Sequence, residues 1–341
     1  MNNKLKKIIQ HALDAFHKTM GLTIQHQPQY KDGYIYPDGI IRIAHKKKEW
    51  YFAPEVKTSI NRTIVGMGKL HPLNNEEKML LITDVVTPPM ADLLKQTDIP
   101  YIDTAGNAYI NEPPLYIFVK GNKARQILVK EPLRRLFKPA GLKVIFALLN
   151  NPSLVNKPYR IIAEAAGVAL GTVGWVINDM KEMLFVLDMG KAHHKLLNLE
   201  NLLKRWIEVY PEQLRPKQII ARFETDNQNW WQQANIKEFG AFWGGEVAAA
   251  KLASYLKPAR VTIYTDQPPG KLVFKNRLRK ADHGNVEVLT PFWNFDYGLA
   301  DEGIVPPLLI YADLMATGDN RNIEMAGIIY EQYLARLVRE N

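Results

Sequence analysis

Hydrophobic positions along the first 125 residues predict a compact α/β domain. Apolar residues recur at spacings of three and four between Leu5 and Phe16, which predicts an amphipathic helix that ends at Gly21. Short apolar runs bounded by turn residues then predict strands. Pro89 begins a short predicted helix that ends at Gln96. The expected strands span residues 22–25, 34–44, 50–56, 79–86, 101–104 and 115–120.

The pattern changes after a basic, proline-containing connector at residues 130–139. Helices are predicted at 141–150, 159–166, 170–183 and 199–208, with a strand pair at 184–188 and 194–198. Beyond them the pattern is mixed, with helices at 245–256, 308–316 and 319–339 and strands at 260–265 and 285–289. We therefore expect α/β and α+β folds in three domains, at residues 1–129, 130–206 and 207–341.

The segment that begins at Tyr159 has the packing pattern of a DNA-binding helix-turn-helix. Ala163 is the small residue where the two helices pack closest, Gly167 allows the tight turn, and apolar residues occupy the flanking positions. The following strand pair predicts a basic wing, so that the motif is a winged helix-turn-helix. The expected DNA-binding residues are Lys157, Tyr159, Arg160, Leu170, Gly171, Thr172, Trp175, Lys191, His193, His194 and Lys195.

Charge supports this assignment. Residues 1–125, 126–206 and 207–341 carry net charges of +5, +6 and −2, which together give the net charge of +9. The middle segment is the shortest and the most basic, as expected of a nucleic-acid-binding module. The predicted recognition helix starts without Arg, Asn or Gln, so we expect phosphate contacts to supply most of the affinity. An ordinary helical hairpin with an Ala-Gly turn remains the alternative.

A second pattern is that of PD-(D/E)XK nucleases, in which an Asp and a Glu-x-Lys on adjacent strands hold a divalent metal. Asp38 follows Pro37, and Glu55 and Lys57 lie at the end of the next strand, on one face of it. Glu-x-Lys also occurs at residues 76–78, so chance alone produces the motif here. We favour a restriction-endonuclease-like domain without activity; an active metal-dependent nuclease and coincidence remain open. We expect no enzyme activity, metal or cofactor.

Composition excludes several other classes. There is no cysteine, which rules out disulfides, thiol catalysis and cysteine-based zinc sites. Hydrophobic residues make up 47% and charged residues 23%, values typical of a globular protein. No apolar stretch approaches the roughly 20 residues needed to span a membrane. The basic start of the chain is interrupted by His11 and Asp14 before a secretory core forms. We therefore expect a cytoplasmic protein that does not bind membranes.

Four segments together resemble the AbiEi-family antitoxins of type IV toxin–antitoxin systems: FKPAGLKVIFALL at 137–149, IAEAAGVALGTVG at 162–174, YIDTAGNAY at 101–109 and YADLMATGD at 311–319. The resemblance spans nearly the whole chain and implies a regulator that represses its own operon and opposes a nucleotidyltransferase toxin. Its partners would be double-stranded operator DNA and that toxin, and a palindromic operator would bring a homodimer. Shorter family members begin with the winged helix, whereas about 130 residues precede it here.

The last domain is predicted to be the module that meets a protein partner. Its net charge of −2 is unfavourable for phosphate, and it contains many large aromatic residues of the kind that dominate protein interfaces. The alternative is that these residues belong to the hydrophobic core. They are Trp230, Trp231, Phe242, Trp243, Phe292, Trp293 and Phe295.

Overall fold

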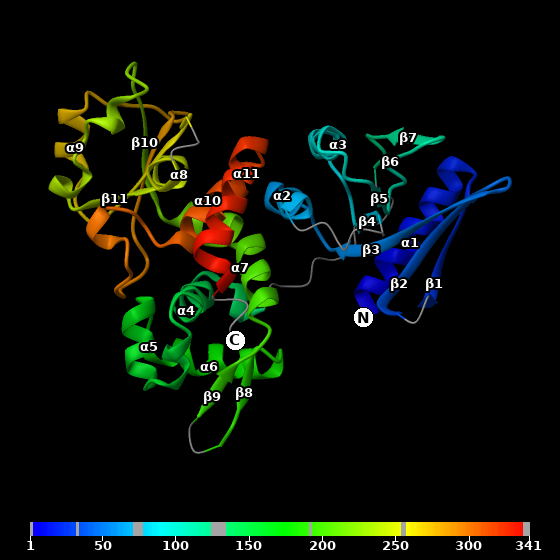
Figure 1. Ribbon diagram of the computed structural model, residues 1–341, viewed down its shortest axis with the longest axis horizontal. Coiled ribbons are helices and arrows are strands. Elements are labelled where there is room, and N and C mark those ends of the chain that lie inside the picture. Colours follow the sequence, from blue (N-terminus) through cyan, green and yellow to red (C-terminus); the bar gives the residue numbers. More distant parts are fainter. Residues whose placement is uncertain are drawn as a thin grey trace. The chain divides into compact units, whose positions relative to one another are not determined.

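The computed structural model describes residues 3–31, 34–70, 78–123, 134–190, 193–253 and 257–336. The chain forms two compact units, Met1–Glu131 (unit 1) and Pro132–Asn341 (unit 2), and it is mixed α/β (Figure 1). In both units helices cover β-sheets, because each sheet has apolar residues on the faces that the helices pack against.

Unit 1 is built around a seven-stranded sheet in the order β1-β2-β3-β4-β5-β6-β7. Strands β3, β4 and β5 are parallel, and the other neighbours are antiparallel. The elements are α1 (Asn3–Met20), β1 (Thr23–Lys31), β2 (Tyr34–His45), β3 (Lys48–Lys57), α2 (Arg62–Leu70), β4 (Lys78–Thr83), α3 (Pro88–Gln96), β5 (Tyr101–Asp103), β6 (Ala108–Glu112) and β7 (Leu115–Val119).

Helices cover both faces of this sheet, with α1 on one side and α2 and α3 on the other (Figure 1). Phe16 of α1 packs in one core with Phe52 and Ile82, whereas Leu81 and Tyr101 face the other core. Side chains alternate between the faces of a strand, so neighbouring residues of β4 join different cores. The sequence pattern predicted α1, α3 and most strands but missed β6 and α2, in which two glycines weaken the helical signal.

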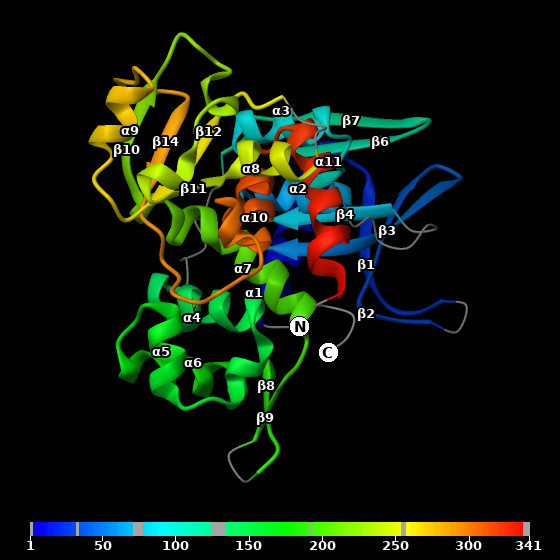
Figure 2. The ribbon, with the colours of Figure 1, turned by 60° about the vertical axis from the view of Figure 1, so that its left-hand side comes forward.

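Unit 2 begins with helices and a small hairpin and continues into a second sheet of order β11-β12-β14-β10-β13. In Figure 2 the hairpin β8–β9 extends away from α4, α5 and α6. The first elements are η1 (Arg135–Phe137), α4 (Pro139–Asn150), η2 (Pro152–Asn156), α5 (Tyr159–Ala166), α6 (Leu170–Glu182), β8 (Val186–Asp188), β9 (His194–Leu196) and α7 (Leu199–Gln213).

The second sheet has β12 parallel to β14 and its other neighbours antiparallel, and α8 and α10 pack together beside it. The remaining elements are η3 (Arg215–Lys217), β10 (Ile219–Glu224), η4 (Trp230–Gln232), η5 (Ile236–Phe239), β11 (Ala241–Gly244), α8 (Gly245–Ala253), β12 (Val261–Thr265), α9 (Gly270–Lys275), β13 (Arg279–Lys280), β14 (Val286–Leu289), η6 (Ala300–Glu302), α10 (Pro307–Thr317), α11 (Asn320–Ile329) and the π-helical turn η7 (Tyr330–Leu334).

Helix α7 connects the two parts of unit 2. Its Trp206 ring stacks on Phe146 of α4 and on Tyr210, with centroid distances of 5.2 and 4.7 Å. The indole Nε1 of Trp206 also donates a hydrogen bond to the carbonyl of Leu142, at 2.8 Å. The boundary expected between residues 206 and 207 therefore falls within a buried face of α7. Separate functions for the two parts of unit 2 remain a prediction.

A loop after β14 returns to these helices and packs on Phe146 (Figure 2). The rings of Phe292 and Phe295 lie 5.0 and 5.8 Å from the Phe146 ring, and the backbone N–H of Asn294 donates to the carbonyl of Ala165 in α5. The aromatic residues expected at a partner surface thus contribute to packing within the chain. Trp230, Trp231, Trp243 and Phe292 are buried, and Phe242, Trp293 and Phe295 are half-buried.

A buried polar network connects α7, the second sheet and α10. Arg215 donates to Asp313 at 2.9 Å and to Glu287 at 2.7 Å. The hydroxyl groups of Tyr210 and Tyr264 donate to the same Asp313 carboxylate, at 3.1 and 3.0 Å. Both acids are matched by donors, as buried charges require, and Arg215 and Asp313 also line a cavity of about 180 Å³.

The helices in the described part of the chain are mostly short. No single helix there is long and apolar enough to cross a membrane, although the bent pair α5 and α6 passes that test together by length and composition.

Candidate nucleic-acid interface

Helices α5 and α6 meet at an angle of 102° across a three-residue break. Helix-turn-helix motifs have interhelical angles of about 90–120°. Gly167 sits in the break with φ +59°, a left-handed conformation that favours glycine. The side chains that the motif requires to be inside, Ala163 and Val173 among them, are buried. The angle, the turn and the buried side chains fit the helix-turn-helix that the sequence predicts, and the motif stays a prediction.

The start of α6 is open to solvent. Leu170 is 56% exposed, and a Cβ added to Gly171 would have no atom within 4 Å. Thr172 and Trp175 are half-buried on the same helix. The first turn is thus a shallow, mostly apolar surface that another molecule can approach closely.

The predicted phosphate contacts come from the start of α5 and from β9. Lys157, Tyr159 and Arg160 are exposed at and before the beginning of α5. Lys195 is exposed on β9, where it pairs with Leu187 of β8. Within the described residues, Lys157, Arg160 and Lys195 have no acidic partner and carry charge that is available to a ligand.

The hairpin β8–β9 is less basic than its sequence suggests. Asp188 was not among the residues predicted from the sequence. Its Oδ2 lies 2.7 Å from Nζ of Lys181 and 3.6 Å from Nε2 of His194. The hydrogen bond from Lys181 is the main reason that the pKa of the Asp188 carboxyl is lowered. His193 is exposed, and His194 is half-buried with its backbone N–H bound to Asn156. The predicted contact Lys191 lies outside the described residues.

The nuclease-like residues of unit 1 are only partly brought together. Nζ of Lys57 lies 3.1 Å from Oε1 of Glu55, so the two side chains share one face of β3. Ile41 of β2 pairs with Phe52 of β3, and continuing that register would place Asp38 opposite Glu55. The side chain of Asp38 is outside the described residues.

The neighbouring strands supply no further free carboxylate to this face. Asp103 is buried and accepts hydrogen bonds from the backbone of Val86, Ala105 and Asn107 and from the Asn107 side chain. Burial raises the pKa of the Asp103 carboxyl, and these donors oppose that rise. Among the described residues, no three His, Asp or Glu side chains are grouped as metal ligands.

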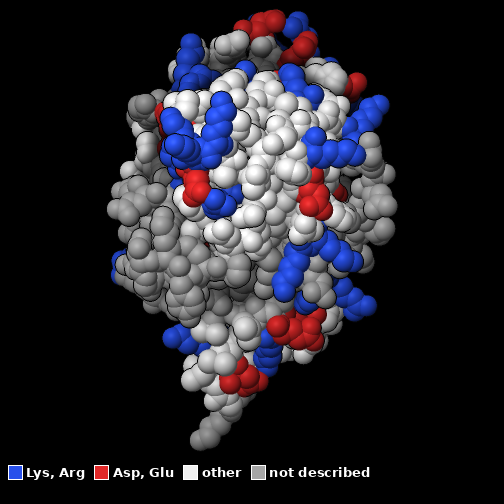
Figure 3. Space-filling model, turned by 90° about the vertical axis from the view of Figure 1, so that its right-hand side faces the viewer, with Lys and Arg blue, Asp and Glu red and all other residues white. Residues whose placement is uncertain are grey.

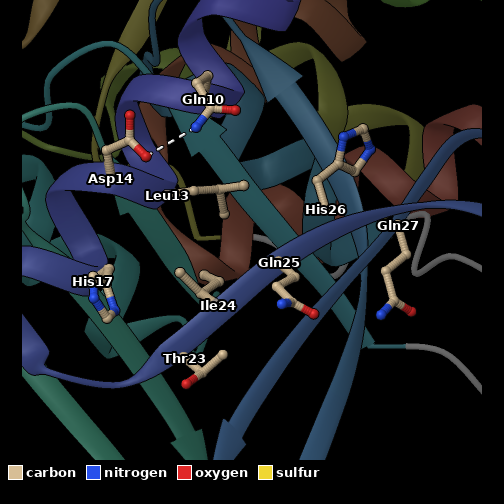
Figure 4. A pocket seen from close by; sticks show the side chains of 9 residues that line it. All are labelled: Gln10, Leu13, Asp14, His17, Thr23, Ile24, Gln25, His26 and Gln27. Carbon is tan, nitrogen blue, oxygen red and sulfur yellow. Dashed lines mark hydrogen bonds between the residues drawn. The ribbon is translucent and has the colours of Figure 1, made fainter.

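An open cavity of about 590 Å³ lies between α1 and β1 of unit 1 (Figure 4). Its polar side chains are engaged locally: Gln10 donates to Asp14 at 2.9 Å, and Nδ1 of His17 lies 2.7 Å from the carbonyl oxygen of Leu22. Lys and Arg side chains are dispersed around an uncharged area on the face in Figure 3. Neither feature gathers the groups needed for catalysis or a continuous phosphate-binding stripe.

Comparison with known families supports one of the general classes for part of the chain. A family model described as "Transcriptional regulator, AbiEi antitoxin, Type IV TA system" matches residues 195–335. Residues 195–335 are thus similar to the AbiEi antitoxin family. The resemblance predicted from the sequence is confirmed for this part of the chain, and it implies a transcriptional regulator of a type IV toxin–antitoxin system. The AbiEi match begins at the hairpin and covers α7 and the second sheet, so it leaves out α5 and α6.

No curated protein and no solved structure matches the chain significantly. Inferences about unit 1 and about α5 and α6 therefore depend on the geometry described above.

We expect the purified protein not to cut DNA with Mg²⁺ or Mn²⁺. Glu55 and Lys57 are paired with each other, and the buried carboxylate of Asp103 is already saturated with donors. The measurement is cleavage of supercoiled and linear DNA, with Glu55→Ala and Lys57→Ala as matched controls. Metal-dependent cutting that disappears in either variant would show that unit 1 is an active nuclease.

Proposed function

We propose that the protein is a DNA-binding transcriptional regulator and the antitoxin of a type IV toxin–antitoxin system. It represses its own operon in the cytoplasm and opposes a nucleotidyltransferase toxin. The observation that carries this proposal is the 102° pair α5–α6, placed in the segment of net charge +6 and followed directly by a region of the AbiEi family. A dimer of the chain would match a palindromic operator.

The winged helix-turn-helix binds duplex DNA with the start of α6 in the major groove. Leu170 and the methyl group of Thr172 suit the C5-methyl group of thymine, because apolar contact with that group is a direct form of base recognition. Lys157, Arg160 and Lys195 contact phosphates on either side, and these contacts supply most of the affinity. The hairpin β8–β9 is the wing, and Lys195 is its described cation.

Unit 1 is a restriction-endonuclease-like domain that has lost its activity. The support is its element order: a helix, an antiparallel three-strand meander, and a crossover helix that leads to a parallel strand. Active metal-dependent cleavage is the second candidate function, favoured by the shared face of Glu55 and Lys57 and by the register of Asp38.

The second part of unit 2, residues 207–341, is the module that neutralises the toxin. Its support is the AbiEi-family match and its net charge of −2, which makes it the least suitable part for duplex DNA. Because its large aromatic residues mostly pack inside the chain, the contact with the toxin would involve other exposed side chains.

Lys195→Ala and Arg160→Ala should each weaken binding to all duplex sequences. Each change removes one phosphate contact, so the slope of log K against log salt concentration should fall by about 0.9 per variant. Thr172→Ala should instead alter preference among sequences. The measurement is a salt titration of operator and unrelated DNA, with Lys217→Ala as a control because Lys217 is exposed elsewhere in unit 2. If neither variant changed the slope of log K against log salt concentration, the proposed DNA interface would be wrong.

Neutralisation of the toxin should reside in unit 2. We expect residues 132–341, expressed beside the cognate toxin from an independent promoter, to restore growth, whereas residues 1–131 do not. The two fragments are divided at the boundary between the units, so Trp206 and Tyr210 stay in their core. A full chain with Arg160→Ala and Lys195→Ala should still restore growth, which separates neutralisation from repression. Rescue by residues 1–131 alone would assign the partner surface to unit 1.

A further inference from the structure

A basic segment interrupts the otherwise acidic second part of unit 2. Residues 270–280 contain five Lys or Arg and no Asp or Glu, although residues 207–341 have a net charge of −2. Two of these cations are paired: Lys275 with Glu238, and Arg279 with Asp226. Lys271, Arg277 and Lys280 are exposed and have no acidic partner among the described residues. Three cations in this segment are therefore available to an anionic ligand.

In the sequence, Phe274 lies between Lys271 and Arg277. It is 88% exposed, which makes it the most exposed of the large hydrophobic side chains that the structure describes. An aromatic ring left in water contributes nothing to the core, but it offers a flat surface on which a nucleobase can stack. Stacking of a base on an exposed aromatic residue, with Lys or Arg beside it, is the usual arrangement in proteins that bind single-stranded nucleic acid.

A cavity of about 520 Å³ opens beside this segment. It is lined by Asn227, Trp230, Gln233, Asn276 and Arg277, and by Asp226 and Glu238, whose charges are paired with Arg279 and Lys275. Trp230 is 5% exposed, and its indole Nε1–H has no acceptor among the described residues. A buried donor without an acceptor costs about 1–3 kcal/mol, so a ligand that reaches Trp230 with an acceptor atom would recover that loss.

The amide side chains that line the cavity also have donors or acceptors that form no hydrogen bond within the described residues. Asn276 uses its Nδ2 to donate to Leu272, and Asn227 uses its Oδ1 to accept from the backbone of Asn229. One Asn thus keeps an acceptor and the other keeps its donors, while Gln233 has no partner among the described residues. Paired donors and acceptors beside an aromatic ring suit the edge of a nucleobase.

We propose that this cavity and Phe274 form a nucleotide-binding site. The base stacks on Phe274 or enters the cavity, where the free amide groups meet its edge, and the phosphate lies against Lys271 and Arg277. The same chemistry fits a free nucleotide and an unpaired position in a single strand. An acidic peptide matches the cations and, through its backbone, the amide groups, but a glutamate-rich one has no flat ring to stack on Phe274. The site is separate from the proposed duplex interface and does not depend on it.

The test is fluorescence anisotropy with the full-length protein and labelled ten-nucleotide single-stranded RNA and DNA. We expect Phe274→Ser to weaken binding about tenfold, as expected for the loss of one stacked base. Arg277→Asn should weaken binding and lower the salt slope by about 0.7, the value for one phosphate contact with a single strand. Asn is chosen because Arg277 has φ +53°, which Asn tolerates.

Matched controls remove the same groups elsewhere. Tyr116→Ser deletes an exposed aromatic ring of unit 1, and Lys217→Asn deletes an exposed cation of unit 2. Both should retain the affinity of the unchanged protein for the single strand. Phe274→Ser should leave duplex DNA binding unchanged, which distinguishes failure of this site from failure of the helix-turn-helix.

Competition identifies the occupant. If ATP, GTP, CTP or UTP displaces the labelled strand, the site accepts a free nucleotide; if only unlabelled single strands displace it, the site accepts an unpaired position in a chain. Either result supports the proposal. Three results would overturn it: no binding of any of these probes, affinity unaffected by both variants, or Phe274-dependent displacement by a glutamate-rich peptide at equal ionic strength.

Discussion

Helix α7 determines the organisation of unit 2, because the aromatic rings on one of its faces pack against both neighbouring parts. Trp206 stacks on Phe146 of the helical part, and Tyr210 continues the stack toward the sheet and hydrogen-bonds to Asp313 of α10. A buried aromatic side chain removes about 150–250 Å² from water, which corresponds to at most about 4–6 kcal/mol per ring. An interface of this kind holds α4 and the helices packed on it in a fixed position on the part of the chain that resembles the AbiEi family.

The same core explains why the buried acids of unit 2 are structural. Burial raises the pKa of Asp313, and Arg215 with the two tyrosine hydroxyls opposes that rise. Burial alone would also raise the pKa of Glu287, but the guanidinium groups of Arg215, Arg222 and Arg260 together outweigh it and the pKa is lowered. Ion pairs of this type are stable only when each charge meets a partner. Function in unit 2 is therefore expected at exposed features: the start of α6, the hairpin, and the surface around Phe274.

The sequence predictions that agree with the structure depend mostly on residues that are close together in the chain. Ala163, Gly167 and Val173 are close in sequence, so their spacing already specified the turn between α5 and α6. Features that depend on distant segments were missed. Asp188 reduces the charge of the hairpin β8–β9 through Lys181, and the cavity beside Arg277 forms only where residues 225–239 meet residues 275–277. The aromatic residues of 292–295 looked like interface residues because their packing partner, Phe146, lies far away along the chain.

The central claim is that the start of α6 enters the DNA groove, and Gly171→Ala tests it most directly. An added Cβ meets nothing within the protein, so the variant should be more stable by about 0.5–1 kcal/mol. If α6 lies in the groove, that methyl group occupies space needed by the bases, and operator affinity should fall several-fold. Gly270→Ala, at another open glycine that begins a helix, should leave duplex affinity unchanged. The measurement is thermal unfolding together with duplex binding for both variants. Greater stability with weaker binding in Gly171→Ala alone is the predicted result, and unchanged or tighter operator binding by that variant would contradict the claim.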